Sequence, residues 1–225
     1  MFMSREHLET LTEIRSLMER SSKFFSLSGL SGVSAGIIAL IGAGAAYVRF
    51  QKDDLLAAYN QPSVLSSDDL YQHVGTMTGA ERYEAVQFVV LDGVLVLIAA
   101  LAAGIFFTVR KARRQGMSVW NPTSRRLLWA MAVPLVAGGI LCLSLIHYNL
   151  IWLVFPSTLI FYGLALFNGS KYTVRDVEYL GLSEIALGLL ALFLSGYTLL
   201  TWAIGFGLLH IVYGTVMYYK YDKSL

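Results

Sequence analysis

The sequence predicts an all-α polytopic membrane protein, with six transmembrane helices in one bundle preceded by an amphipathic helix. Three observations lead to this prediction. Of the 225 residues, 56% are hydrophobic and 14% are charged, against about 25% charged in an ordinary soluble domain. The apolar residues stand in long blocks, which is typical of a chain in lipid. Basic residues cluster in alternate connections between these blocks. A disordered chain and a typical soluble enzyme are thereby excluded.

Residues 1–26 have the pattern of a cytoplasmic amphipathic helix. Leu8, Leu11, Ile14 and Met18 recur at three- and four-residue steps between charged residues, so they form one apolar stripe. The segment is too long and too acidic for a secretory signal peptide, and we expect the first apolar block to be an uncleaved anchor. The helix could lie on the membrane surface or dock a soluble partner.

Residues 27–219 form the expected transmembrane domain, because each span needs about 20 apolar residues. Two apolar stretches are each too long for one span. We therefore expect turns at His147-Tyr148-Asn149 and near Ser195-Gly196-Tyr197. The six spans are predicted at roughly 27–48, 86–109, 127–147, 150–167, 181–196 and 200–219, of which the fifth is short.

The distribution of basic residues predicts the orientation. With the N-terminus inside, 14 of the 17 Lys and Arg residues are cytoplasmic, and the outside holds Arg49, Lys52 and Arg82. Such a bias sets orientation. Both termini, including the tail 220–225, are then cytoplasmic, as is the basic loop 110–126. The acidic loop of about 51–84 is external and too short for an independent domain.

Two of the predicted spans share a short pattern. Gly29-Leu30-Ser31 and Gly36 match Gly181-Leu182-Ser183 and Gly188 in the same register. Both segments begin a span that runs from inside to outside, so a parallel repeat is one interpretation. A shared composition rich in Gly, Ala and Leu is the other.

Three ionisable residues, Asp92, Glu184 and His210, fall inside the predicted spans. A charge at the bilayer centre costs ~2.5–3.5 kcal/mol or more, so such residues are usually functional or paired. At 1.5 Å per residue, Asp92 lies ~9 Å below the outer boundary, His210 ~15 Å deep and Glu184 ~5 Å from the inner boundary. They could form a proton or ion site. Alternatively, Glu184 reaches the interface, His210 bonds a neighbouring helix, and Asp92 is a structural polar lock.

Small residues at Ser28, Gly32 and Gly36 step by four and form a helix-packing face. Such faces let helix backbones meet closely in a membrane. The face could pack within the chain or form a homodimer seam.

Basic residues flank the second and third spans on the predicted cytoplasmic side. They could contact anionic lipid headgroups, or they could serve only as the topology determinant. These residues are Arg110, Lys111, Arg113, Arg114, Arg125 and Arg126.

The sequence predicts no enzyme, no metal site and no cofactor. The single cysteine, Cys142, excludes an intramolecular disulfide and any multi-cysteine metal site. The stretch Gly29-Leu30-Ser31-Gly32, with His210 on the last span, resembles the GxSG serine and late histidine of rhomboid proteases. It departs from them because the motif opens the first span and the glycine expected after the histidine is displaced. The net charge of +2 is too small to indicate nucleic acid as a partner.

Two further resemblances concern the ends of the chain. The stretches Glu13–Ser22, Leu27–Gly32 and Gly205–Gly214 resemble a group of small six-span bacterial inner-membrane proteins of unassigned function. The glycine-leucine hairpin at 181–214 is similar to the short repeats of acid-resistance membrane proteins of the HdeD type. The first resemblance implies a bacterial inner membrane as the location.

The sequence favours the interpretation that this protein is a non-catalytic membrane interaction or regulatory module. Its partners are the lipid bilayer, a further copy of the chain, or a protein at the N-terminal helix or the external loop. The alternative is a small transporter or proton-coupled channel that uses Asp92 and His210. The scarcity of intramembrane polar residues favours the module, because transporters usually carry a polar midplane site.

Overall fold

The computed structural model describes residues 28–52, 79–116, 118–148, 150–194 and 196–223. Within these ranges the chain is helical and contains no strand. The predicted amphipathic helix at 1–26 and most of the predicted external loop at 51–84 lie outside the described residues.

Five long helical stretches and one shorter helix make up the described bundle. The last helix, Thr198–Asp222, is continuous, although its hydrogen-bonding pattern changes along its length. The elements are α2 (Gly29–Phe50), α5 (Gly79–Arg114), α6 (Pro122–His147), η2 (Ile151–Leu153), α7 (Val154–Gly169), η3 (Ser170–Tyr172) and α8 (Asp176–Ala191), followed by α9 (Thr198–Trp202), η4 (Ala203–Leu209), α10 (His210–Met217) and η5 (Tyr218–Asp222).

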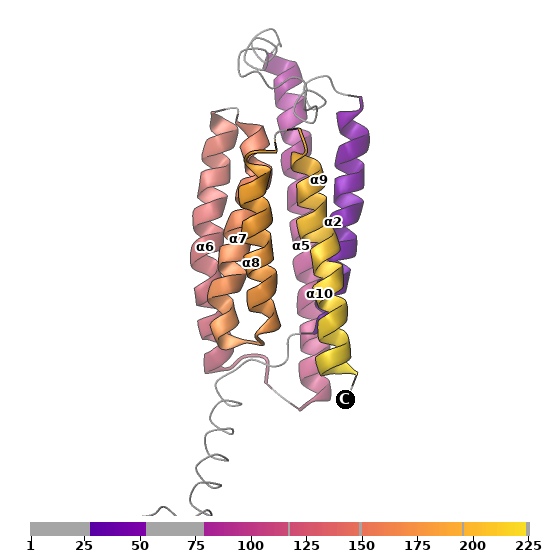
Figure 1. Cartoon of the computed structure of the whole chain (residues 1–225), viewed down its shortest axis with the longest axis vertical. Helices are drawn as coiled ribbons and strands as arrows, with labels where there is room; N and C mark the ends of the chain where they lie inside the picture. The colour runs from indigo at the N-terminus through magenta and orange to yellow at the C-terminus, as the bar shows by residue number, and fades with distance from the viewer. Residues whose placement is uncertain (1–27, 53–78, 117, 149, 195, 224–225) are drawn as a thin grey trace, which may run out of the picture.

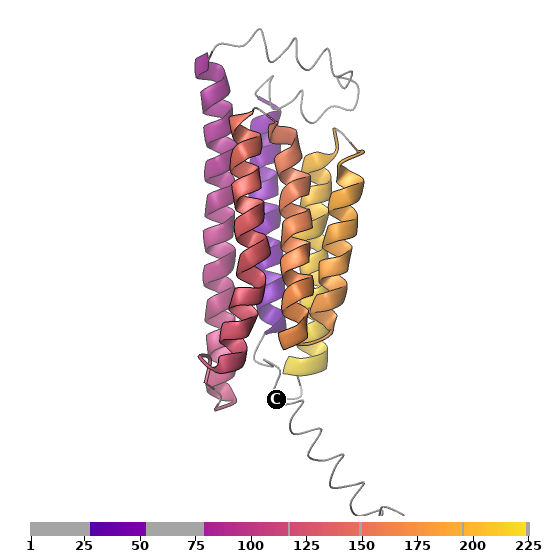
Figure 2. The same cartoon turned by 90° about the vertical axis from the view of Figure 1, so that its left-hand side faces the viewer.

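The helices form two layers (Figures 1 and 2). One layer holds α6, α7 and α8, with α7 in the middle, and the other holds α5, α2 and the last helix, with α2 in the middle. Short turns join the helices of the first layer. Side chains of α7, α8 and the last helix therefore meet between the layers.

Within the described residues, five helices are long and apolar enough to cross a membrane: α2, Val86–Arg114 within α5, α6, Ile151–Tyr172 and Thr198–Asp222. The fifth predicted span differs from the sequence prediction. It corresponds to α8, which begins at Asp176 rather than 181 and has 16 residues. The reason is that the polar residues Asp176 and Glu178 occupy the first turn of this helix, where acidic side chains favour the helix dipole.

The predicted turns agree with the helix ends. α6 ends at His147, and α8 and the last helix are joined through Gly196, whose φ of 87° favours glycine. At the start of α6, Asn121 accepts a hydrogen bond from the Ser124 backbone, and the Ser124 side chain accepts one from the Asn121 backbone. This capping box satisfies two backbone donors that the helix leaves unpaired.

Glycines set the closest helix contacts in each layer. A Cβ on Gly36 of α2 would lie 2.6 Å from the carbonyl oxygen of Gly207, and one on Gly214 would lie 2.5 Å from the Val33 nitrogen. In the other layer, Gly163 of α7 meets Gly181 of α8 backbone to backbone. The small-residue face of α2 thus packs on the last helix of the same chain.

The two segments with the shared pattern use it in the same way. Gly29 and Gly36 of α2 pack against the last helix, and Gly181 and Gly188 of α8 pack against α7. In both cases the partner helix runs antiparallel and presents a glycine, Gly214 or Gly163. The glycines of both segments therefore serve close helix packing.

Candidate intramembrane polar site

The structure brings together two of the three intramembrane residues singled out from the sequence. Glu184 of α8 and His210 at the start of α10 lie between the two layers, with 0% and 4% of their surface exposed. Glu184 Oε1 is 3.3 Å from His210 Nδ1. The expectation that Glu184 reaches the membrane interface is therefore wrong. Because α8 begins earlier than predicted, Glu184 stands eight residues into the helix, about 12 Å from its start.

Sequence reasoning missed the third member of this site, Tyr162 of α7. Its hydroxyl lies 2.8 Å from His210 Nε2. Tyr162, Glu184 and His210, which we call the triad, come from three helices and span both layers. A tyrosine inside an apolar span gives no sequence signal of its own, since Tyr is common at membrane interfaces.

The hydrogen bonds of His210 determine where its protons lie. Nδ1 is 3.0 Å from the carbonyl oxygen of Gly205, and a carbonyl can only accept, so Nδ1 carries a hydrogen and donates it. In the neutral imidazole, Nε2 is then an acceptor, and the Tyr162 hydroxyl donates to it. His210 is satisfied as a neutral side chain.

Glu184, in contrast, is not satisfied. Neither of its carboxyl oxygens has a hydrogen-bond partner among the described residues. Although His210 Nδ1 is only 3.3 Å from Oε1, its N–H donates to the Gly205 carbonyl. A buried polar group without a hydrogen bond is unusual in proteins, so Glu184 is the group of this site that needs an explanation.

The backbone near Glu184 is shaped to leave room for it. A Cβ on Gly205 would lie 2.5 Å from Glu184 Oε2 and 2.5 Å from Leu159 Cδ2. Gly205 belongs to η4, a seven-residue π-helical stretch that ends directly before His210. Such stretches in α-helices often mark functional sites. Here the stretch lets the His210 side chain reach back five residues to the Gly205 carbonyl.

Asp92 lies elsewhere. It is on α5, and its carboxylate faces α2, about 3.6 Å from where a Cβ of Gly42 would stand. Its side chain is partly exposed. Among the described residues no hydrogen bond or ion pair joins Asp92 to His210 or Glu184. A relay through all three residues is therefore not continuous in this structure.

The basic residues predicted to contact lipid headgroups separate into two kinds. Arg110, Arg113, Arg114, Arg125 and Arg126 are exposed, but Lys111 is only 8% exposed. Its Nζ lies 2.6 Å from Asp222 Oδ1. The other oxygen of Asp222 accepts hydrogen bonds from the Gly29 nitrogen and the Ser28 hydroxyl. Asp222 thus caps α2 from the far end of the chain.

A second contact ties the last helix to α8 at the same end of the bundle. Lys220 Nζ and the Tyr221 hydroxyl both donate to the Asp176 carboxylate, at 2.9 and 2.6 Å. Partial burial alone would raise the pKa of Asp176, but these hydrogen bonds outweigh burial and hold that pKa below its usual range. The C-terminal turn therefore joins α2, α5 and α8.

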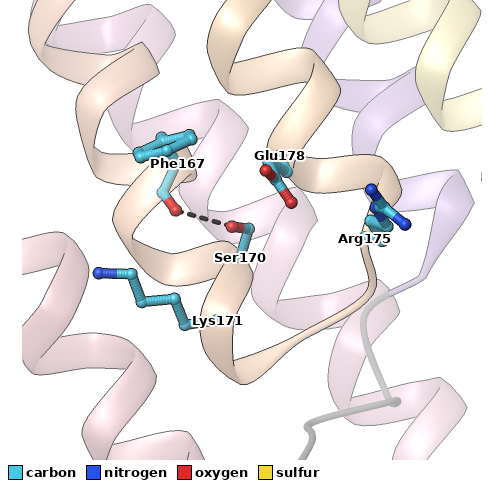
Figure 3. A pocket seen from close by; sticks show the side chains of 5 residues that line it. All are labelled: Phe167, Ser170, Lys171, Arg175 and Glu178. Atoms are coloured by element: carbon cyan, nitrogen blue, oxygen red, sulfur yellow. Dashed lines mark hydrogen bonds between the residues drawn. The ribbon is translucent and has the colours of Figure 1, made fainter.

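A pocket of about 250 Å³ lies at the end of α7, lined by Phe167, Ser170, Lys171, Arg175 and Glu178. Figure 3 shows that Lys171 and Arg175 point away from one another. The Ser170 hydroxyl donates a hydrogen bond to the Phe167 carbonyl. Because the two cations do not converge and Glu178 adds a negative charge, this pocket does not have the geometry of an anion site.

The residues that resemble a serine protease motif are used otherwise. The Ser31 hydroxyl donates to the Ser28 carbonyl, whereas His210 contacts Tyr162 and Gly205. No cluster of three or more His, Cys, Asp or Glu side chains that could hold a metal ion occurs among the described residues.

Comparison with family models, with curated proteins and with solved structures gave no match. The candidate site consequently stands on its own geometry.

Proposed function

We propose that this protein is an integral membrane protein with six spans and both ends on the cytoplasmic side, working as a non-catalytic interaction or regulatory module. The single observation that carries the proposal is the complete burial of Glu184, with His210 and Tyr162 around it. Tyr162 and His210 bind one another across the layers, and Glu184 is fully buried beside them. That arrangement suits a closed, conformationally defined bundle.

Further observations support the orientation and the contact surfaces. Arg110, Arg113 and Arg114 follow the apolar part of α5. This end of α5 lies at the same end of the bundle as the C-terminal end of the last helix (Figure 1), where Lys111 pairs with Asp222. This clustering of positive charge favours a cytoplasmic location for that end. The exposed arginines are the groups available to anionic lipid headgroups, while Lys111 is committed to Asp222. The N-terminal segment 1–26 and the loop 51–84 remain the proposed surfaces for a protein partner.

Thiol accessibility in intact membranes tests this proposal. In a Cys142→Ser background, single cysteines replace Ser157 and Thr201, both buried, and Glu184, with Ser170 at the helix end as the reactive control. A reagent that cannot cross lipid should label only Ser170→Cys, and only from the cytoplasmic side. Labelling at 184 would show that water reaches the mid-bilayer. Labelling at 157 or 201, near the starts of α7 and of the last helix, would show that the bundle is open at that end, and labelling of 170 from the other side would reverse the orientation.

A small proton-coupled transporter is the second candidate. The observation that favours it is that both Glu184 oxygens lack hydrogen-bond partners, as a carboxyl that binds and releases a proton during transport would. On this view Glu184 and His210, rather than Asp92 and His210, form the working pair. Labelling from both sides in the thiol experiment would favour this candidate.

A further inference from the structure

The triad contains an acid without a hydrogen-bond partner among the described residues and a histidine whose Nδ1 hydrogen has two acceptors within reach. His210 Nδ1 lies 3.0 Å from the Gly205 oxygen and 3.3 Å from Glu184 Oε1. With Glu184 protonated, the Gly205 carbonyl is the better acceptor, and this is the bond that the structure contains. The acid is left with no hydrogen-bond partner among the described residues.

Ionisation of Glu184 would reverse that preference. A carboxylate is a stronger acceptor than a neutral carbonyl, since charge-assisted hydrogen bonds are shorter and roughly twice as strong. The Nδ1–H would then move from Gly205 to Glu184 Oε1. The Gly205 carbonyl would lose the side-chain donor that it has in η4, and the π-helical stretch Ala203–Leu209 would lose one of its ties.

We propose that Glu184 is the proton acceptor of an intramembrane proton-binding site, and that its protonation state decides whether His210 donates to Gly205 or to Glu184. The ligand is a single proton. On release, the O–H bond of Glu184 breaks and the proton leaves to water, while His210 stays neutral and keeps its Nδ1 hydrogen. This inference rests on the proposed function, for which it supplies the signal: a proton sensed inside the bundle.

The other titratable and charged groups around the site are not placed to bind this proton. From α7 the neighbours are Tyr162, which donates to Nε2, and Leu159. α2 approaches the last helix at His210 with the glycines Gly32 and Gly36, and its charged residue in the described range is Arg49, near its far end. From the last helix, the next titratable group is Tyr213, whose hydroxyl is 3.5 Å from the Ser183 hydroxyl of α8. Among these described groups, Glu184 alone is both acidic and without a hydrogen bond.

Trp202 is a natural fluorescence probe for the proposed change of the His210 hydrogen bond from Gly205 to Glu184. Trp202 packs against Phe206 with the rings tilted and their centroids 5.0 Å apart, and Phe206 stacks on His210 at 5.9 Å. A change in η4 should therefore alter the environment of Trp202. The three other tryptophans serve as the background, and a Trp202→Phe variant isolates the signal.

Infrared difference spectroscopy of the full-length protein in nanodiscs, recorded across a pH titration, tests the proposal. The wild type should show the C=O band of a protonated carboxylic acid that is lost as the pH rises, together with a Trp202 fluorescence change of the same midpoint. Glu184→Gln should abolish both signals. The matched control Asp92→Asn should leave both in place.

His210→Phe distinguishes a switch from a mere buried acid. Without the Nδ1–H that an ionised Glu184 would recruit, the carboxylic acid band should persist to a higher pH than in the wild type. If Glu184→Gln does not fold, the wild type labelled with ¹³C-glutamate is measured instead. A band that arises from a glutamic acid must then shift in frequency. A band that survives Glu184→Gln, fails to shift with the label, or never titrates would overturn the proposal. None of these outcomes depends on whether thiol reagents enter the bundle. The experiments can therefore contradict the proposed proton-binding site without contradicting the proposed interaction module, and the reverse.

Discussion

At the scale of single residues, a few atoms decide how the polar interior is arranged. Glu184 lies eight residues into its helix because this helix starts earlier than its hydropathy indicates, and it fits between the layers because Gly205 has no side chain. The Tyr162 hydroxyl orients the His210 ring through a hydrogen bond of 2.8 Å with Nε2. The chemistry of the site thus depends on one glycine and one hydroxyl as much as on the two ionisable groups.

The contact at Gly205 leads to a prediction of stability. In Gly205→Ala the new methyl would overlap both Glu184 Oε2 and Leu159 Cδ2, each at 2.5 Å. Both of these side chains are fully buried, so neither can move aside freely. Overpacking of this kind costs about 1–3 kcal/mol, which thermal unfolding in detergent micelles would register as a lower midpoint.

The control for this experiment is Gly139→Ala on α6, where a Cβ would meet no atom within 4 Å. Alanine is favoured over glycine in a helix by about 1 kcal/mol, so this variant should unfold at the same temperature as the wild type or above it. Equal midpoints for the two variants would show that Gly205 is not closely packed.

At the scale of helices, the glycine faces determine which helices pair. Gly32 and Gly36 bring α2 against the last helix, and Gly163 and Gly181 bring α7 against α8. There is little hydrophobic drive between helices in lipid, so van der Waals contact of this kind is a main source of association. The outer helices α5 and α6 instead expose large apolar side chains such as Leu95, Ile98 and Val136, as surfaces in contact with lipid do.

Two glycines on the same helix test this pairing. Gly36→Ala would place its Cβ 2.6 Å from the Gly207 carbonyl oxygen and 2.7 Å from Ile211 Cγ1, whereas Gly44→Ala meets no atom within 4 Å. Because a backbone oxygen cannot rotate away, Gly36→Ala should cost about 3 kcal/mol or more. Gly44→Ala should change the stability by no more than about 1 kcal/mol.

Equilibrium unfolding of both variants in mixed micelles gives the two free energies directly. Equal effects would mean that the small-residue face of α2 is not buried within the chain. In that case a seam between two copies would become the better explanation of this face.

At the scale of the whole molecule, the C-terminal turn closes the bundle. Asp222 holds Lys111 of α5 and the first residues of α2, and the neighbouring Lys220 and Tyr221 hold Asp176 of α8. The last helix therefore connects both layers at this end, as the triad does near mid-depth. These contacts join the two layers into one bundle.

Removal of the Asp222 carboxylate should loosen the whole bundle. Asp222→Ala leaves Lys111 buried without this carboxylate and exposes the uncapped start of α2. Breaking one partner of a buried ion pair costs about 3–5 kcal/mol, which chemical unfolding of the purified protein would measure. Lys220→Met, at the exposed pair with Asp176, should have a clearly smaller effect.

A double variant separates charge burial from capping. In an Asp222→Asn background, Lys111→Met removes the remaining buried charge and should recover part of the lost stability. If the two single losses simply add, the ion pair contributes nothing beyond its separate residues.

The amino-acid sequence by itself determined the class of this protein and the order of its helices. Long apolar blocks are sufficient for that, because lipid leaves a spanning chain few alternatives to the helix. The turns after His147 and at Gly196 were predicted from local chemistry alone. The small-residue face of α2 was also visible, since a four-residue step can be recognised within one helix.

Only the tertiary structure decided which helices and side chains meet. Nothing in a linear pattern tells that Tyr162 of α7 meets His210, that Glu184 is buried while Asp92 faces Gly42, or that Lys111 is paired with a residue 111 positions away at Asp222. These contacts join segments that are distant in the sequence. They depend on how the two layers pack, and that packing follows from the sum of many weak contacts rather than from any local signal.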